Sequence, residues 1–316
     1  MYYDIIGDIH GNADALERLL LKLGYQPDGK GFTQPGHTLI LVGDLIDRRP
    51  GQRRVLEIAR TMRDAGNAIV LMGNHEFNAI CFAMPSANGG YIRPHKEGNV
   101  RQHQGFLDEF PFGSEDHKDA IEFFKSLPLW LDLETFRVVH ACWDIPSMQV
   151  LSPLLDEQNR PSGNALFEGY DHKHSAIYEA AETVLKGPEV KLPDDVFFHD
   201  KDGKRRSNAR VTWWKLNQGP ERSFAVSPGL LADHDMTTVW QDAHRFAYRD
   251  SKPLFFGHYW QRSFDENLQQ RAIDSGQRAF CLDYSAAIDS GELVAATVSD
   301  TGLASPKICW SSVLAG

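Results

Sequence analysis

The sequence predicts an α/β fold: a four-layer αββα sandwich of two mixed β-sheets flanked by helices, with an inserted helical cap. Three observations lead to this prediction. Short apolar runs alternate with amphipathic stretches over residues 2–82, which is typical of β-α-β units with a parallel sheet. Strand-like runs return after residue 253 and supply a second sheet. The polar, proline-interrupted stretch at about 145–235 has helical periodicity, and we interpret it as the cap.

The first part of the chain contains three predicted strands, each followed by a predicted helix. The strands are short and mostly apolar, and they cover residues 2–6, 38–42 and 68–72. The helices have apolar residues at helical spacing, and they cover residues 12–23, 50–65 and 76–82. Gly24 suits the end of the first helix and Pro50 the start of the second. Short connections of this kind predict right-handed crossovers and a mostly parallel first sheet.

A loop, a helix and a hairpin are predicted next. Glycine and proline recur through residues 84–115, so we expect an irregular loop over or beside the functional site. Residues 116–126 have helical periodicity, and residues 129–133 and 137–139 form a predicted hairpin around Glu134-Thr135. The whole chain, residues 1–316, is therefore predicted to be one domain that carries this loop and the cap.

The second sheet is predicted from three strand-like runs late in the chain. These runs are residues 253–256, 279–282 and 293–298. We expect these runs to form one sheet with antiparallel pairing.

Charge and hydropathy restrict the partners of the protein. The formal net charge is −10, and an acidic surface repels phosphate backbones, so general nucleic-acid binding is not expected. No run approaches the ~20 apolar residues of a membrane span, and the N-terminus has no signal-like apolar core. We therefore expect a cytoplasmic protein that binds no membrane. A phosphorylated protein or small molecule is still compatible with a local cationic site.

Polar residues follow the strand-like runs and suggest a metal site. The three early motifs are Gly7-Asp8-Ile9-His10-Gly11, Gly43-Asp44-Leu45-Ile46-Asp47-Arg48 and Gly73-Asn74-His75-Glu76. Parallel strands end at one edge of a sheet, which is where open α/β sheets bind ligands. Two histidines also follow later runs, so the candidate ligands are Asp8, His10, Asp44, Asn74, His140 and His258. Carboxylate, imidazole and amide groups suit manganese, iron, zinc, nickel or magnesium.

The spacing of these residues favours more than one ion. Asp8 and His10 lie on the same side of an extended chain, so both can bind one ion. Asp44 has two carboxylate oxygens and can bridge two ions. Two metals ~3.5–4 Å apart can polarise a phosphoryl group and activate a hydroxide near neutral pH.

The motifs, in this order and followed by a lone His and a late Gly-His, resemble those of the calcineurin-like metallophosphoesterases. The Asp47-Arg48 pair is similar to the serine/threonine protein phosphatase (PPP) branch, which includes bacterial phosphatases and diadenosine tetraphosphatases. The resemblance covers about residues 2–82, 137–144 and 253–298. It implies two divalent metal ions, with manganese favoured. Asp8, His10 and Asp44 would hold the first, and Asp44, Asn74, His140 and His258 the second.

The same resemblance implies the catalytic residues. His75 would be the general acid that protonates the leaving oxygen, since histidine titrates near physiological pH. Asp47 would orient and charge the His75 imidazole. Arg48 would bind phosphate oxygens through its planar fork, with Asn74 beside it. For the family's second phosphate-binding arginine, Arg210 is the candidate and Arg206 the alternative.

Several further residues carry open alternatives. Arg49 stands where the family usually has Gly, so either the turn needs no positive φ or Arg49 adds a cation to the pocket. Asp283 could support a metal-bound histidine. Trp213 and Trp214 are either packing residues or a stacking platform for a base. The remaining histidines, His103 among them, are expected on the surface or in loops.

We therefore predict a metal-dependent phosphatase that hydrolyses phosphate monoesters with a dinuclear-metal-activated hydroxide, in the manner of the serine/threonine protein phosphatases. Hydrolysis of a dinucleoside polyphosphate such as diadenosine tetraphosphate is the first alternative, and it would need an aromatic clamp. A non-catalytic metal-binding regulatory module is the second. The presence of His75, Asp47 and Arg48 argues against the regulatory module, because a module that only binds metal needs no general acid.

Overall fold

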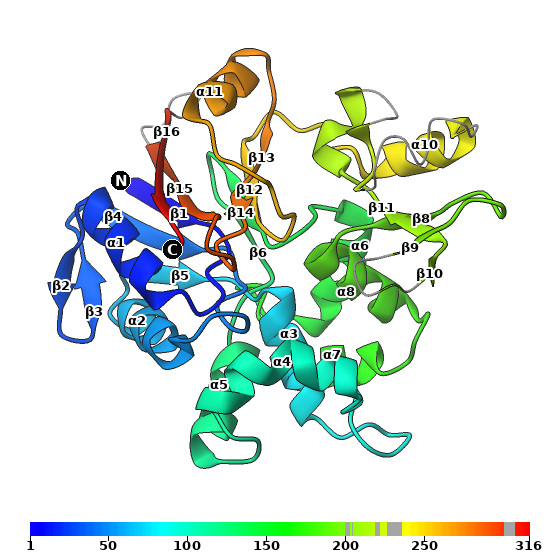
Figure 1. Cartoon of the computed structure of the whole chain (residues 1–316), viewed down its shortest axis with the longest axis horizontal. Helices are drawn as coiled ribbons and strands as arrows, with labels where there is room; N and C mark the ends of the chain where they lie inside the picture. Colours follow the sequence, from blue (N-terminus) through cyan, green and yellow to red (C-terminus); the bar gives the residue numbers. More distant parts are fainter. Residues whose placement is uncertain (200–202, 204, 219–221, 226–235, 300–306) are drawn as a thin grey trace.

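The structure is a computed structural model of the whole chain (Figure 1). It describes residues 1–199, 203, 205–218, 222–225, 236–299 and 307–316. Two β-sheets form its centre, and helices cover their outer faces.

The first sheet has six strands within the described residues, in the order β14-β15-β1-β4-β5 with β16 paired to β15. The strands β1 (Tyr2–Ile6), β4 (His37–Leu41) and β5 (Ala68–Val70) run parallel, as the sequence predicts. On the other side of β1, β15 (Glu292–Ser299) runs antiparallel. The edge is completed by β14 (Asp283–Tyr284) and β16 (Ile308–Leu314), both antiparallel to β15.

The second sheet has four strands in the described part of the chain, in the order β13-β12-β7-β6. The predicted hairpin is present as β6 (Trp130–Asp132) and β7 (Arg137–Val139), which pair antiparallel. On the other side of β7 lies β12 (Leu254–Phe256), followed by β13 (Ala279–Cys281). β12 pairs in parallel with both β7 and β13. Both sheets are therefore mixed.

The predicted late sheet is wrong in two respects. The run at 293–298 lies in β15 of the first sheet, not in the second. The runs at 253–256 and 279–282 do share the second sheet, but they pair in parallel. A short apolar run shows that a strand is buried and does not show which neighbour it pairs with. Here β15 covers the edge of β1 that β4 leaves open, which removes an exposed edge.

The four-layer sandwich is confirmed by the packing. One buried cluster joins Ile5, Ile40 and Val294 of the first sheet to Val138 and Phe255 of the second, so the inner faces of the sheets pack together. The outer face of the first sheet packs against α1 (Ala13–Leu23) and α2 (Gln52–Asp64). Figure 1 shows the segment with α6, α8 and β8–β11 on the opposite side of the molecule from α1 and α2.

The predicted loop at 84–115 contains a helix, so that prediction is wrong for residues 97–109. The segment between α3 (Asn74–Ala83) and α5 (Glu115–Lys125) includes α4 (Glu97–Glu109). Only His103 and Phe106 of α4 are fully buried. A helix that buries so few residues has little apolar periodicity, which is why the pattern did not reveal it.

Among the described residues of the predicted cap at 145–235, the α-helices lie in its first part. It begins with α6 (Ile145–Leu151), a 3₁₀ turn (Ser152–Leu154), α7 (Ala165–Tyr170) and α8 (Ala176–Lys186). Short strands follow: β8 (Glu189–Lys191), β9 (Phe198–His199), β10 (Arg205–Arg206) and β11 (Asn208–Arg210). Residues 200–202, 204, 219–221 and 226–235 of the predicted cap lie outside the described residues. The single-domain organisation stays a prediction.

The other described elements complete the fold. They are the hairpin β2 (Gln26–Asp28) and β3 (Gly31–Thr33), the 3₁₀ turns at Trp213–Gln218 and His244–Phe246, and the helices α10 (Thr237–Ala243) and α11 (Glu266–Asp274). Within the described ranges, none of the helices has the combined length and apolar character that crossing a bilayer requires.

Candidate metal centre

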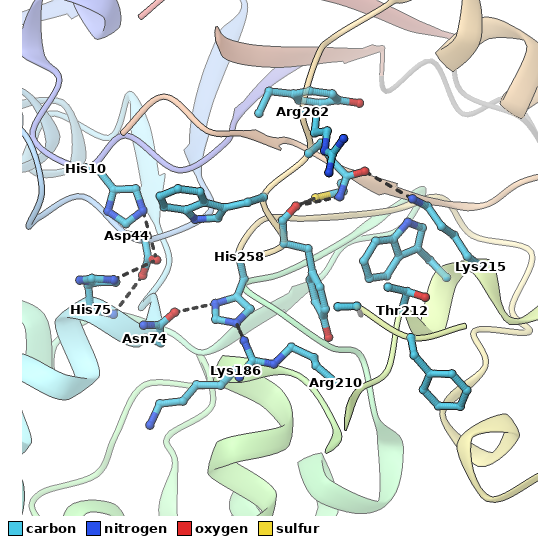
Figure 2. A pocket seen from close by; sticks show the side chains of 18 of the residues that line it. His10, Asp44, Asn74, His75, Lys186, Arg210, Thr212, Lys215, His258 and Arg262 are labelled. Atoms are coloured by element: carbon cyan, nitrogen blue, oxygen red, sulfur yellow. Dashed lines mark hydrogen bonds and ion pairs between the residues drawn. The ribbon is translucent and has the colours of Figure 1, made fainter. Parts of the chain in front are cut away.

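The motif residues meet where the carboxyl ends of both sheets adjoin. Asp8 and His10 follow β1, Asp44 follows β4, and Asn74 comes four residues after the end of β5. From the second sheet, His140 follows β7 and His258 follows β12. Figure 2 shows His10, Asp44, Asn74, His75 and His258 gathered on one side of a cavity. The structure therefore brings together residues that are far apart in the sequence.

Asp44 lies at the centre of this cluster. Its Oδ2 is 3.7 Å from His10 Nε2 and 3.9 Å from His75 Nε2, and its Oδ1 is 3.3 Å from His140 Nε2. Two groups of potential ligands result, His10-Asp44-His75 and Asp44-His140-His258, and within each the ligand atoms lie within 4.8 Å of one another. Burial opposes ionisation of Asp44, but the surrounding imidazoles, His140 foremost, lower its pKa below the usual range. Asp44 is thus an ionised carboxylate common to both groups.

The hydrogen bonds of two histidines fit metal binding. His140 Nδ1 donates to the Val42 carbonyl oxygen at 2.9 Å, and His10 Nδ1 donates to the Ile46 carbonyl oxygen at 3.1 Å. In each neutral ring the remaining Nε2 therefore carries a lone pair. His10 Nε2 is buried and has no hydrogen-bond partner. His140 Nε2 faces acceptor oxygens of Asp44 and Asn74, at 3.3 and 3.2 Å. A cation between these groups would satisfy lone pairs that nothing else satisfies.

Asn74 lies between the two histidines of the second group, His140 and His258. Its Oδ1 accepts from His258 Nδ1 at 2.6 Å, and it lies near His140 Nε2. On the other side of the His258 ring, Arg210 Nη1 donates to Nε2 at 2.9 Å, while Arg210 Nη2 donates to Glu189 Oε1 at 3.3 Å. The candidate arginine from β11 therefore reaches the site directly. Arg206, the alternative, also lines the cavity.

Asp8 lies beside the second sheet and belongs to neither three-residue group. Its carboxylate accepts from the His258 backbone N–H at 3.0 and 3.2 Å. Burial, and then repulsion from Asp283 and Asp44, raises the pKa of Asp8 well above its usual range. Burial is also the first reason that the pKa of Asp283 rises to about 7, and its Oδ2 is buried without a hydrogen-bond partner. Three buried carboxylates at one place favour a bound cation.

The predicted contact between His75 and Asp47 is present. His75 Nδ1 lies 2.5 Å from Asp47 Oδ2, so it donates to that oxygen and its Nε2 faces Asp44. Burial opposes a charge on His75, but Asp44 and Asp47 together raise its pKa above the ordinary value of 6.5. Arg48 lines the cavity with its guanidinium 5.1 Å from the centre of the Trp260 ring.

Unusual backbone conformations are concentrated here. Among the described non-glycine residues with positive φ, five belong to the predicted site: His10, Asp44, Asp47, Arg48 and His258. Such conformations cost about 1–3 kcal/mol each and persist where the surrounding structure enforces them. Arg49 is not one of them, so the turn needs no positive φ there. The idea that Arg49 adds a cation to the pocket is wrong, because its side chain binds the Ala287 carbonyl and Asp289.

The cavity in front of the cluster has a volume of about 1410 Å³ and a cationic lining. Its basic residues include Arg48, Arg93, Lys186, Arg210, Lys215 and Arg262. Trp214 and Trp260 supply aromatic surface. Trp213 is buried and its Nε1 donates to the Ala141 carbonyl oxygen at 3.0 Å, so it is a packing residue. Trp260, 42% exposed, was not identified from the sequence because an isolated Trp in a loop follows no pattern.

Two supporting residues were also missed. The Glu76 carboxylate accepts from the backbone N–H groups of Asp44, Leu45 and Gly73 at 2.8–2.9 Å, and so ties two motif loops together. The position of Glu76 directly after His75 in the sequence could have indicated that it supports the site. His103 is buried and its Nδ1 lies 3.0 Å from Asp47 Oδ1, so its predicted place on the surface or in a loop is wrong. It lies on α4, the helix that the sequence pattern did not show.

Comparison with known proteins agrees with this geometry. Residues 1–141 match the family model described as calcineurin-like phosphoesterase. An asymmetrical bis(5'-nucleosyl)-tetraphosphatase from Oceanobacillus iheyensis is 30% identical over 147 residues, 46% of this chain and 57% of that protein. A symmetrical bis(5'-nucleosyl)-tetraphosphatase from Hamiltonella defensa is 38% identical over 190 residues, 58% of this chain and 60% of that protein. The matches thus span less than two thirds of these relatives.

One solved structure supports the fold. A protein serine/threonine phosphatase from Saccharomyces cerevisiae superposes with a TM-score of 0.51 at 14% identity, covering 99% of this chain and 80% of that one. At this level of identity the likeness concerns the α/β sandwich alone.

Proposed function

The resemblance to the calcineurin-like phosphoesterases is confirmed over residues 1–141, and from this premise we propose that the chain is a metal-dependent hydrolase of phosphoester bonds. One observation carries the proposal: the buried, ionised Asp44 is shared by two groups of potential metal ligands, beside a histidine that is paired with a carboxylate. A site that only stored metal would not need the second feature.

The residues are proposed to hold two divalent cations, with manganese as first choice. Asp8, His10 and Asp44 hold one, and Asp44, Asn74, His140 and His258 hold the other. The buried His10 Nε2 without a hydrogen-bond partner supports this assignment. When bound, such a pair of ions supplies Lewis acidity and a water of lowered pKa.

The remaining residues bind the phosphate and move the proton. Arg48 and Arg210 bind non-bridging phosphate oxygens from two sides, and their places in the cavity lining support this role. His75 donates a proton from Nε2 to the leaving oxygen, and Asp47 holds its Nδ1 so that Nε2 faces the reacting group. We expect these steps in the cytoplasm, which stays a prediction.

The proposal is tested by measuring phosphate release from p-nitrophenyl phosphate and from a phosphoserine peptide. The purified chain should be active with added Mn²⁺, lose activity after dialysis against EDTA, and regain it when Mn²⁺ is restored. Asp44→Asn is the matched variant and should be inactive with either ester. A chain that binds two metal ions per molecule and hydrolyses no phosphoester would instead be the non-catalytic metal-binding module.

A dinucleoside polyphosphate is the second candidate substrate. The cavity is large and cationic, and Trp260 offers an aromatic face next to Arg48, as a nucleotide with several phosphates requires. The names of the two curated relatives point the same way. Chromatography of the products separates the candidates: diadenosine tetraphosphate would yield two ADP, or AMP and ATP. Faster phosphate release from the phosphopeptide would favour the monoesterase.

A further inference from the structure

We propose that His103, on helix α4, is a positioning residue that orients His75 through the Asp47 carboxylate shared by the two histidines. The proposal rests on the proposed function, because it gives His75 the role of general acid. It goes beyond that function by assigning part of the catalytic geometry to the segment between α3 and α5.

The geometry places Asp47 between two imidazole rings. His75 Nδ1 lies 2.5 Å from Oδ2, and His103 Nδ1 lies 3.0 Å from Oδ1 and 3.3 Å from Oδ2. An ionised carboxylate only accepts hydrogen bonds, so both rings donate to it. All three side chains are buried, and no more than 9% of any of the three residues is exposed. Water therefore cannot readily replace either donor.

Two donors hold the carboxylate more firmly than one. The torsion that rotates the carboxyl group of an aspartate has a broad energy profile. A single bond to His75 would leave that rotation free, and the His75 ring would turn with it. Because His103 holds Oδ1, the direction of Oδ2 is fixed, and with it the direction in which His75 Nε2 faces.

Helix α4 is itself fixed against the Asp47-Arg48 turn. A Cβ atom on Gly105 would lie 3.1 Å from the backbone nitrogen of Arg48, so the helix backbone approaches the turn closely. Six residues after His103, the Glu109 carboxylate accepts from the backbone N–H groups of Gly51, Gln52 and Arg53 at 2.8–2.9 Å. Glu109 thus caps α2, whose own N-cap residue Gly51 has no side chain for this.

This bracing explains how the turn keeps its conformation. Asp47 and Arg48 have φ values of 69° and 77°, which non-glycine residues rarely adopt. Contacts from α4 on both sides of the turn offset the cost. His103 is therefore attached to a rigid element, as a positioning residue must be.

His103 is separate from the metal ligands. It is in neither ligand group, and its ring packs on Phe82 and Phe106 with centroids 5.2 and 5.0 Å apart. Its removal should leave the metal content unchanged. A residue that only filled space would also pack in this way, so the experiment must separate packing from orientation.

The test compares two leaving groups in the variants His103→Leu and His103→Asn. Leu keeps the volume and removes the donor, whereas the Asn amide can still donate to Asp47. p-Nitrophenolate leaves without a proton, but the serine alkoxide of a phosphopeptide needs one. We expect His103→Leu to lower kcat for the phosphopeptide about tenfold or more, to change kcat for p-nitrophenyl phosphate less than about threefold, and to leave KM unchanged. His103→Asn should restore most of the loss.

Gln104→Ala, on the exposed side of α4, is the matched control and should match wild type. Equal losses on both substrates, an unchanged kcat, or no recovery in His103→Asn would overturn the proposal. A second readout does not need turnover: the low-field ¹H NMR signal of the His75 Nδ1 proton should shift or broaden in His103→Leu and return in His103→Asn. If wild type hydrolyses neither ester, the proposed function fails. An unchanged His75 signal in a folded, metal-loaded His103→Leu protein overturns the positioning role by itself.

Discussion

The two ligand groups that share Asp44 are built from different parts of the molecule. His10, Asp44 and His75 come from loops at the ends of adjacent parallel strands in one sheet. His140 and His258 come from the other sheet. The first group needs only the local β-α-β units to form, whereas the second needs the two sheets to dock correctly. The second group should therefore be more sensitive to changes at the interface between the sheets.

The contact at Gly257 shows how closely the sheets approach at the site. A Cβ atom on Gly257 would lie 1.9 Å from Asp8 Oδ1 and 2.9 Å from a Val42 methyl carbon. Only glycine allows β12 to deliver His258 while the His258 backbone N–H binds Asp8. Asp8 is thus one of the first-sheet residues whose position depends on how the second sheet docks.

Asp44→Asn should have the largest effect, because it alters both groups at once. An amide has one acceptor oxygen instead of two and lacks the negative charge. We expect both metal positions to weaken and phosphoester hydrolysis to fall by about 10³-fold or more. Metal content after gel filtration, measured by mass spectrometry, checks the first expectation. Two tightly retained ions would contradict the bridging role.

His75→Ala should abolish proton donation and leave both groups otherwise able to bind metal. We expect kcat for a phosphoserine peptide to fall about 10²–10⁴-fold, the usual contribution of a general acid. Metal content should stay near that of wild type. Loss of both ions in this variant would mean that His75 acts as a ligand, since its Nε2 lies 3.9 Å from Asp44 Oδ2.

The motifs after the strands of the first sheet were easier to interpret from the sequence than the two histidines of the second sheet, for a physical reason. Strands β1, β4 and β5 each end in a compact motif, and parallel strands must bring their ends to one edge. His140 and His258 follow similar runs, but nothing in those runs shows that β12 pairs in parallel or that β15 leaves the second sheet. Pairing depends on long-range packing, so the sequence indicated these histidines as candidate ligands from their position after strand-like runs, but it did not show how those strands pair.

The support of the site was less predictable than its ligands. His103 and Glu109 act from α4, which buries too few residues to show helical periodicity. Arg49 has the charge of a pocket residue, but its contact with Asp289 depends on a loop far along the chain. Glu76 could have been found, because a carboxylate next to His75 in a buried helix start must have partners.

Gly257→Ala should disturb the site where the two sheets meet. The added methyl group cannot fit beside Asp8 Oδ1, so the Asp8 carboxylate, the loop with His258 or both must move. We expect metal binding to weaken and activity to fall about 10–10²-fold, with a small loss of thermal stability. Gly98→Ala, in helix α4, is the control for glycine replacement, because a Cβ there meets nothing within 4 Å and the backbone has no positive φ. Retention of both ions in Gly257→Ala would mean that the site tolerates movement between the sheets.

The smallest expected effect is a shift in pH dependence, and it concerns the first group alone. Burial disfavours a charge on His75, but Asp44 and Asp47 outweigh it and raise the pKa above 6.5. A general acid works when protonated, so kcat for a phosphoserine peptide should fall as pH rises through this raised pKa. In Asp47→Asn the hydrogen-bonded carboxylate is replaced by a neutral amide, which lowers the pKa of His75, and the alkaline limb should move to lower pH by about one unit. The alkaline limb of the pH profile for p-nitrophenyl phosphate should not move, since that leaving group needs no proton.

A phosphopeptide pH profile of Asp47→Asn identical to that of wild type would show that Asp47 does not influence the ionisation of His75. Asp44, which both groups share, would then be the source of the raised pKa of His75.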